Sequence, residues 1–158
     1  MIKIRRYREG DAPLLWSLFF NTVRNVNIKD YSQAQVEAWA PTGFNAEIWA
    51  NKIEDLNPFV AEVKGKIAGY ADIQHDGLID HFFCDMAFQG KGVGKALMQA
   101  LFSEGSQSGL NLYHAHVSIT ARPFFERMGF NVVKEQQVNI RSAVITNFLM
   151  ERVETKGN

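Results

Sequence analysis

The stretch that decides the fold is Gln89-Gly90-Lys91-Gly92-Val93-Gly94-Lys95-Ala96. It follows a mostly apolar run, residues 78–84, that is typical of a central strand, and it opens a segment with apolar residues at helical spacing. Its three glycines within five residues let the backbone pass close to a ligand. The first amides of a helix are unpaired and partly positive, so the stretch predicts a loop that binds phosphate or pyrophosphate.

Two common phosphate-binding patterns do not fit this loop. A P-loop requires glycine where the chain has Gln89 and serine or threonine where it has Ala96. The dinucleotide-binding pattern G-x-G-x-x-G fails because its third glycine would fall on Lys95 or Leu97. The stretch instead fits [Gln/Arg]-x-x-Gly-x-[Gly/Ala]. A tight strand-to-helix turn that binds nothing is the alternative.

Composition limits the classes of protein to consider. With 158 residues, 46% of them hydrophobic, the chain is long enough for one domain, which we expect over residues 1–153 with a flexible tail over 154–158. Seventeen Lys and Arg balance seventeen Asp and Glu, which argues against a nucleic-acid or membrane partner. Cys84 is the only cysteine, so a disulfide scaffold is excluded. No apolar run has the length of a membrane span or a signal core, which predicts a cytoplasmic protein.

Hydrophobic periodicity predicts one mixed α/β domain with an antiparallel meander. Asp11 is expected to cap the first helix, Ser32 and Gln35 fit a capping box, and Gly65-Lys66 is expected to form a hairpin turn. Strands are expected at residues 2–5, 59–64, 67–74, 78–84, 110–117, 130–138 and 143–150, and helices at residues 11–23, 32–39, 45–52, 93–101 and 121–128.

The glycine loop, in this order of elements, resembles the acetyl-CoA pyrophosphate loop of the GCN5-related N-acetyltransferases, the GNAT superfamily. Residues 118–130, SITARPFFERMGF, are similar to the family's downstream motif N-x-x-A-x-x-F-Y-E-x-x-G-F. The resemblance covers nearly the whole chain. Tyr31-Ser32, Ala38-Trp39-Ala40 and Thr146-Asn147-Phe148 resemble the small bacterial YafP-like acetyltransferases most. It implies a mixed, mostly antiparallel central sheet, flanked by helices and splayed at the acetyl-CoA cleft.

The resemblance also implies a cofactor site, with acetyl-CoA as co-substrate and no metal. Main-chain groups of Cys84 and Met86 would pair with the pantetheine arm, and the amides of residues 90–95 would hold the pyrophosphate. Ser118 stands where the family usually has an asparagine that touches the cofactor arm. The residues expected at the cofactor are Cys84, Asp85, Met86, Gln89, Gly90, Lys91, Gly92, Val93, Gly94, Lys95, Ala96, Ser118 and Phe125.

Phe125 departs from the family pattern. Many members have tyrosine there, and its hydroxyl protonates the departing CoA thiolate. A phenyl ring cannot donate a proton, so that role is either moved or unnecessary. Tyr31, between the first two helical segments, can replace the missing tyrosine or serve as a packing residue. Tyr113, on a strand expected beside the cleft, is a weaker candidate.

Asp80 is the first candidate for taking the proton of the acceptor amine. A carboxylate inside an apolar strand is expected to be buried and to have a raised pKa. The alternative is a structural aspartate paired with Arg122 or Arg141. His75 and His81 can act as bases, but neither position requires a function. Cys84, which has no base nearby in the sequence, is interpreted as a core residue rather than a nucleophile.

A metal site is not predicted. His114 and His116 have an i, i+2 spacing on one strand, but no cysteine or third close histidine joins them. The resemblance therefore implies an N-acetyltransferase in which a primary amine of a small molecule or peptide attacks acetyl-CoA directly in a ternary complex. A CoA-binding sensor that lost catalysis, suggested by Phe125 and Ser118, and a nonbinding structural domain are the alternatives. The acceptor and the oligomeric state stay open, a homodimer included.

Overall fold

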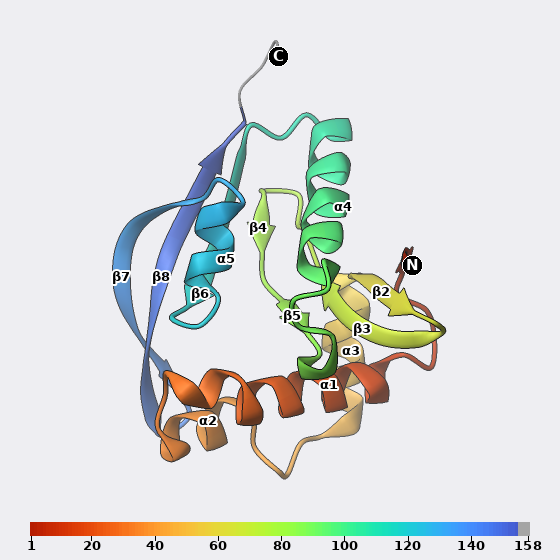
Figure 1. Cartoon of the computed structure of the whole chain (residues 1–158). Coiled ribbons are helices and arrows are strands. Elements are labelled where there is room, and N and C mark those ends of the chain that lie inside the picture. Colours follow the sequence, from red (N-terminus) through yellow and green to blue (C-terminus); the bar gives the residue numbers. More distant parts are fainter. Residues whose placement is uncertain (155–158) are drawn as a thin grey trace.

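The computed structural model describes residues 1–154, in which fifteen elements form a mixed α/β domain (Figure 1). Of the tail predicted over 154–158, only Glu154 lies in this range, and its N–H donates to the Asn111 carbonyl at 2.8 Å. The elements are β1 (Ile2–Arg6), α1 (Ala12–Asn25), η1 (Asn27–Lys29), α2 (Gln33–Trp39), α3 (Ala46–Leu56), β2 (Phe59–Val63), β3 (Lys66–Ala71), β4 (Leu78–Ile79), β5 (Phe82–Cys84), η2 (Met86–Phe88), α4 (Val93–Gln107), β6 (Leu112–Ser118), α5 (Arg122–Arg127), β7 (Asn131–Ile140) and β8 (Ala143–Val153).

The strands form two sheets of four, in the orders β1-β2-β3-β5 and β4-β6-β8-β7. Every neighbouring pair is antiparallel except β4 and β6, which run parallel. Figure 1 shows β7 and β8 on one side of β4 and β5, and β2 and β3 on the other. The predicted mixed, mostly antiparallel architecture is confirmed. Across residues 1–154, no helix combines the length and apolar character that a membrane crossing needs.

The predicted central strand at residues 78–84 is interrupted, and this interruption separates the sheets. Its first half, β4, pairs with β6, and its second half, β5, pairs with β3. At the break, the carboxylate of Asp72 accepts the backbone N–H groups of His81 at 2.6 Å and Asp80 at 3.4 Å. Because these two amides bond to a side chain, the chain can leave one sheet and enter the other without losing buried hydrogen bonds.

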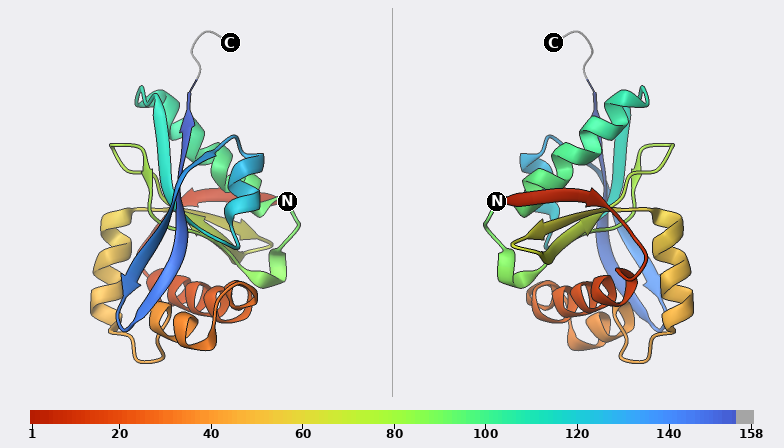
Figure 2. Two further views of the ribbon diagram at one scale, coloured as in Figure 1. Left: turned by 90° about the vertical axis from the view of Figure 1, so that its left-hand side faces the viewer. Right: turned by 90° about the vertical axis from the view of Figure 1, so that its right-hand side faces the viewer.

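Two cores lie on opposite faces of the first sheet. Because strand side chains alternate, Val60 of β2 packs into the core formed with α1, α2 and α3, and Ala61 packs into the core formed with α4. Figure 2 shows α4 and α1 on opposite sides of β1–β3. The first sheet is thus held rigidly from both faces, which fixes the position of its open edge, β5.

Local signals set several helix and turn boundaries. The capping box of Ser32 and Gln35 is present at the start of α2, and the Asn45 side chain caps α3 by accepting the N–H of Ile48 at 3.0 Å. The β2–β3 turn lies one residue earlier than predicted. Its central residues are Lys64 and Gly65, with φ angles of 53° and 78°, because a two-residue hairpin of this type requires positive φ at both positions.

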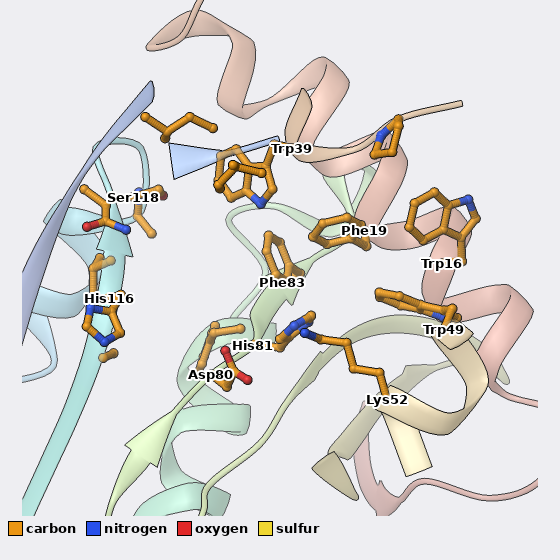
Figure 3. A pocket seen from close by; sticks show the side chains of 18 of the residues that line it. Trp16, Phe19, Trp39, Trp49, Lys52, Asp80, His81, Phe83, His116 and Ser118 are labelled. Carbon is orange, nitrogen blue, oxygen red and sulfur yellow. The ribbon is translucent and has the colours of Figure 1, made fainter. Parts of the chain in front are cut away.

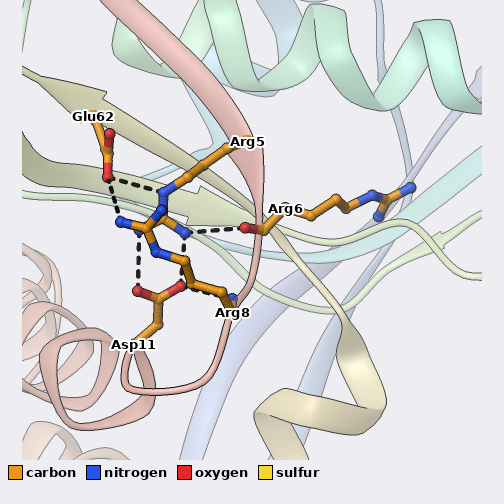
Figure 4. A network of polar contacts seen from close by, with 5 residues as sticks. All are labelled: Arg5, Arg6, Arg8, Asp11 and Glu62. Carbon is orange, nitrogen blue, oxygen red and sulfur yellow. Dashed lines mark hydrogen bonds and ion pairs between the residues drawn. The ribbon is translucent and has the colours of Figure 1, made fainter.

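Asp11 precedes α1 as predicted, but its side chain does not cap the helix. Its carboxylate instead accepts two bonds from the Arg5 guanidinium, at 2.8 and 3.0 Å, and one from the Arg8 backbone N–H at 2.9 Å (Figure 4). Arg5 also donates to Glu62 at 2.8 Å. This network ties β1, β2 and the start of α1 together. Burial opposes ionisation of Asp11, but the bonds from Arg5 and Arg8 outweigh it and lower the pKa of the carboxyl group.

The first prediction concerns this network. Asp11→Ala leaves the mostly buried Arg5 without its main counter-charge, so we expect the free energy of unfolding to fall by about 3 kcal/mol in urea denaturation. Glu104→Ala is the matched control, because it removes an ion pair with Arg6 whose side chains are 39% and 40% exposed. The control should cost less than about 1 kcal/mol. Equal losses for the two variants would contradict the assigned role of Asp11.

Candidate active site

The gap between the two sheets is bordered by the free edge of β5. Asp72 donates its N–H to the His81 carbonyl, and Asp85 donates to the Ala68 carbonyl, at 3.2 and 2.8 Å. Hydrogen bonding to β3 therefore falls on residues 81, 83 and 85, and the alternate residues turn their backbone groups the other way. The N–H of Cys84 thus faces the gap. An extended ligand can pair there as an added strand does.

The carbonyl of Cys84 already accepts hydrogen bonds, and its thiol is buried. The carbonyl accepts from the Thr22 hydroxyl at 3.2 Å and from the Gln89 side-chain amide at 3.0 Å. The side chain of Gln89, predicted at the cofactor, therefore ties the glycine loop to the end of β5. Burial raises the pKa of the Cys84 thiol to about 12, which keeps the thiol protonated and favours the core interpretation over a nucleophile.

The glycine loop presents a row of free backbone amides. Gly92, with a φ of 84°, immediately precedes α4, and the first helical bond runs from the Ala96 N–H to the Gly92 carbonyl at 3.0 Å. Among the described residues, no hydrogen bond uses the N–H groups of residues 90–95. The side chains of Lys91 and Lys95 are exposed beside them. The loop therefore offers free N–H groups at residues 90–95, whereas the N–H of Ala96, also predicted at the cofactor, is used by the helix.

Gly94 and Gly90 are glycines for different structural reasons. A Cβ at Gly94 would lie 3.1 Å from the Phe124 ring and 3.7 Å from the Cys84 sulfur, so Gly94 lets α4 approach α5 and β5 closely. A Cβ at Gly90 would meet nothing within 4 Å, and its φ of 74° is the reason for glycine there. Gly94 is thus needed for packing.

The Asp85 side chain, in the short segment before the loop, acts locally. The Asp85 carboxylate accepts the N–H of Ala87 at 2.8 Å and so caps η2. Met86 is exposed, and Val93 is buried under the loop. Of the residues predicted at the cofactor, the structure therefore offers mainly backbone groups, together with the two lysines.

A cavity of about 710 Å³ opens between α1, α3 and the splayed strands (Figure 3). Aromatic side chains form one wall, and Asp80, His81 and Lys52 lie together beside it, with the His81 ring within 6.0 Å of the Phe19, Trp49 and Phe83 rings. The aromatic residues that Figure 3 labels are Trp16, Phe19, Trp39, Trp49 and Phe83. The predicted residues Tyr31, Ser118 and Phe125 also line the cavity.

Asp80 lies in this cavity but is exposed, so the prediction that it is buried was wrong. The strand break at Asp80 turns its side chain out of the sheet. Neither arginine proposed as a structural partner pairs with it, because Arg122 pairs with Glu126 at 3.5 Å and Arg141 donates to the Ala38 carbonyl at 2.6 Å. Within residues 1–154, the Asp80 carboxylate is left open to the cavity.

The buried carboxylate of the site is Asp72, which the sequence argument overlooked. Its side chain is fully buried, and burial raises its pKa to about 6 although bonds from Gln74 and from the His81 N–H favour the ionised form. The Gln74 amide donates to it at 2.6 Å. The signal available in the sequence was that Asp72 directly follows the apolar end of β3. Asp72 thus positions Asp80 and His81 through their backbones.

His81 presents a neutral imidazole to the cavity. Burial lowers its pKa to about 4, so the ring is uncharged at neutral pH. Its Nδ1 lies 3.0 Å from the hydroxyl of Tyr70. Because that hydroxyl is fully buried and His81 is its hydrogen-bond partner, it donates to Nδ1. We therefore assign the ring proton to Nε2, the nitrogen left for the cavity.

The hydroxyls of Tyr31 and Ser118 already form hydrogen bonds within the protein. The Tyr31 hydroxyl donates to the Thr146 carbonyl at 2.7 Å and accepts the Ile119 N–H at 2.9 Å, which favours a packing role. The Ser118 hydroxyl accepts the Ala121 N–H at 3.0 Å. The ring of Phe125 is buried in the core next to Phe82.

Tyr113 does not face the cleft. Its hydroxyl donates to the Phe102 carbonyl of α4 at 3.2 Å. The prediction that Tyr113 is a weaker candidate to replace the missing tyrosine was therefore wrong.

Comparison with known proteins agrees with this geometry. The family model described as an acetyltransferase (GNAT) domain matches residues 27–150. The chain belongs to the GNAT acetyltransferase family. It is 35% identical over 150 residues to YafP of Escherichia coli K12, described as an uncharacterized N-acetyltransferase, with 94% of each chain covered.

Two solved structures show the same fold. A GCN5-related N-acetyltransferase from Rhodopseudomonas palustris superposes with a TM-score of 0.92 at 24% identity, covering 96% of this chain and 95% of the other. The PaiA N-acetyltransferase of Thermoplasma acidophilum, solved in complex with coenzyme A, has a TM-score of 0.77 at 17% identity, with 98% and 99% covered. The predicted fold and family are thus confirmed.

The second prediction tests Asp72. A carboxyl group whose pKa is higher in the folded chain than in the unfolded one binds its proton more readily when folded, so it adds stability as pH falls through that range. From a pKa of about 6, the wild-type chain should gain about 1 kcal/mol over Asp72→Asn between about pH 7 and pH 5. Urea unfolding of both proteins at the two pH values measures this gain. A difference that does not change with pH would show that Asp72 does not titrate there.

Proposed function

We propose that this protein is an acetyl-CoA-dependent N-acetyltransferase that acetylates a primary amine by direct attack in a ternary complex. The observation that carries the proposal is the row of unpaired amides at residues 90–95 beside the free edge of β5. These two features suit the two parts of coenzyme A, an anionic pyrophosphate and an extended pantetheine arm. The coenzyme A in the PaiA structure supports the assignment.

The cofactor would dock along the gap between the sheets. The pyrophosphate accepts hydrogen bonds from the loop amides, and Lys91 and Lys95 add positive charge next to it. The pantetheine arm lies against β5 and pairs with the Cys84 N–H, which the strand alternation turns toward the gap. This direction leads the thioester toward the cavity where Asp80 and His81 lie.

The chemistry requires an uncharged amine and a place for the negative charge of the intermediate. The Asp80 carboxylate takes the amine proton, directly or through a water, and the amine nitrogen bonds to the thioester carbon. A backbone N–H near Cys84 donates to the oxygen of the tetrahedral intermediate. As the intermediate collapses, the C–S bond breaks and CoA leaves. Phe125 supplies no proton, which is tolerable because a thiol has a pKa of about 8.5 and its thiolate is a fair leaving group.

The third prediction tests the pyrophosphate site. Lys95 is the third residue of α4, where a negative side chain favours the helix dipole but opposes a bound anion. Lys95→Glu should therefore weaken CoA binding by at least about tenfold in calorimetry without lowering the melting temperature. Lys66→Glu, the same change at an exposed position of β3, is the control and should bind CoA normally. Unchanged affinity in Lys95→Glu would place the anion elsewhere.

A CoA-binding sensor is the second candidate, favoured by the buried Phe125 ring and by the engaged hydroxyls of Tyr31 and Ser118. In a sensor, the cleft would hold CoA firmly and no amine would be acetylated. CoA-thiol release measured against a broad amine panel separates the two functions, since a transferase must release thiol with at least one acceptor.

The fourth prediction tests Asp80 as the proton acceptor. Asp80→Asn should lower kcat by about 100-fold and leave the affinity for acetyl-CoA unchanged, because the carboxylate faces the amine and not the cofactor. Steady-state kinetics and calorimetry measure the two quantities separately. Wild-type turnover in this variant would remove Asp80 from the reaction.

A further inference from the structure

We propose that the acceptor is an aromatic amino acid or a close analogue, a compact molecule with a primary amine, a carboxylate and a flat ring. The inference rests on the proposed function, since it names the substrate of the same cavity. Three features of the cavity support the inference. They are its aromatic wall, its balance of charge, and the arrangement of Asp80, His81 and Lys52.

The aromatic wall is built to receive a flat ring. Trp16 stacks on Phe44 with centroids 4.2 Å apart, and its ring meets the edge of Trp49 at 5.1 Å. Phe19 lies 5.5 Å from Trp49 and meets the edge of Phe83 at 5.0 Å. These rings come from α1, the α2–α3 connection, α3 and β5, and all of them line the cavity. An aromatic side chain gains both burial and ring contacts against such a wall.

The charges of the cavity argue against a polycationic acceptor. Among the described residues that line it, the charged side chains are Asp80, Lys52 and Arg141. A polyamine or aminoglycoside would bring several positive charges to a single carboxylate that already shares the cavity with two cations. An acceptor that carries one amine and one acid group matches this set. Arg141 already donates to the Ala38 carbonyl, so we assign Lys52 as the cation that meets the ligand.

The polar side of the cavity offers separate places for an amine and a carboxylate. Asp80 and Lys52 lie next to His81, and both affect its titration, Asp80 raising and Lys52 lowering its pKa (Figure 3). Lys52 has no hydrogen bond or ion pair within residues 1–154. The amine of the ligand would meet Asp80, and its carboxylate would accept from the Lys52 ammonium and the Nε2–H of His81. An α-amino acid carries its amine and its carboxylate on one carbon, so the two groups can reach Asp80 and Lys52, which both lie next to the His81 ring.

The test compares four probes by CoA release: phenylalanine, phenylalanine amide, alanine and spermidine. Phenylalanine has the amine, the carboxylate and the ring, and each other probe lacks at least one of these. We expect the highest kcat/KM for phenylalanine. In Lys52→Met, the ratio of kcat/KM for phenylalanine to that for phenylalanine amide should fall by at least about tenfold, because only phenylalanine loses a charge-assisted bond. Lys66→Met, at the exposed first residue of β3, should leave the ratio unchanged.

Calorimetry separates failure of this inference from failure of the proposed function. With CoA bound, the wild-type protein should bind phenylalanine, and Lys52→Met should weaken that binding by at least about tenfold. If phenylalanine binds and Lys52→Met weakens its binding, but no probe releases CoA, the acceptor site stands and the transferase function is overturned. If CoA release is fastest with spermidine or phenylalanine amide, or if Lys52→Met leaves the ratio intact, the function stands and the inferred acceptor class is overturned.

Discussion

The fold of the site depends on the carboxylate of Asp72. It accepts the backbone N–H groups of Asp80 and His81, and these are the residues at which the chain leaves one sheet and enters the other. Without a buried acceptor at this place, the N–H groups of Asp80 and His81 would lose their partner, and a continuous strand would have the lower free energy. The gap, the free edge of β5 and the exposure of Asp80 all follow from this one contact. A buried carboxylate is itself costly, and its raised pKa reflects that cost.

Three parts of the molecule then line up along the gap. The amides of residues 90–95, at the start of α4, form an electropositive end, and the Cys84 N–H offers a backbone donor in the middle. The cavity with Asp80, His81 and Lys52 lies at the far end. An acyl-CoA has the complementary order of a diphosphate, an extended arm and a reactive thioester. The two cores above and below the first sheet hold these parts in fixed positions. Backbone groups supply most of the proposed cofactor contacts, so the identity of several side chains at the loop matters little.

Sequence reasoning succeeded where a local pattern decides the structure. The capping box at Ser32, the glycine loop before α4 and the order of strands are set by residues close together in the chain, and the structure has all three. It failed where a distant residue decides. The burial of Asp80 was wrong because Asp72, eight residues earlier, breaks the strand. Gln89 and Asp11 have side-chain partners that no local spacing reveals. The neutral state of His81 and the open position of Lys52 also depend on packing between distant elements.

The most direct measurement of the central claim is a titration of the ¹⁵N-labelled protein with coenzyme A, followed by amide NMR. The account predicts that the largest shifts occur at the amides of residues 90–95 and of Cys84, because these N–H groups gain their first hydrogen-bond partners. Saturable binding that leaves those resonances in place and moves a different part of the chain would contradict it.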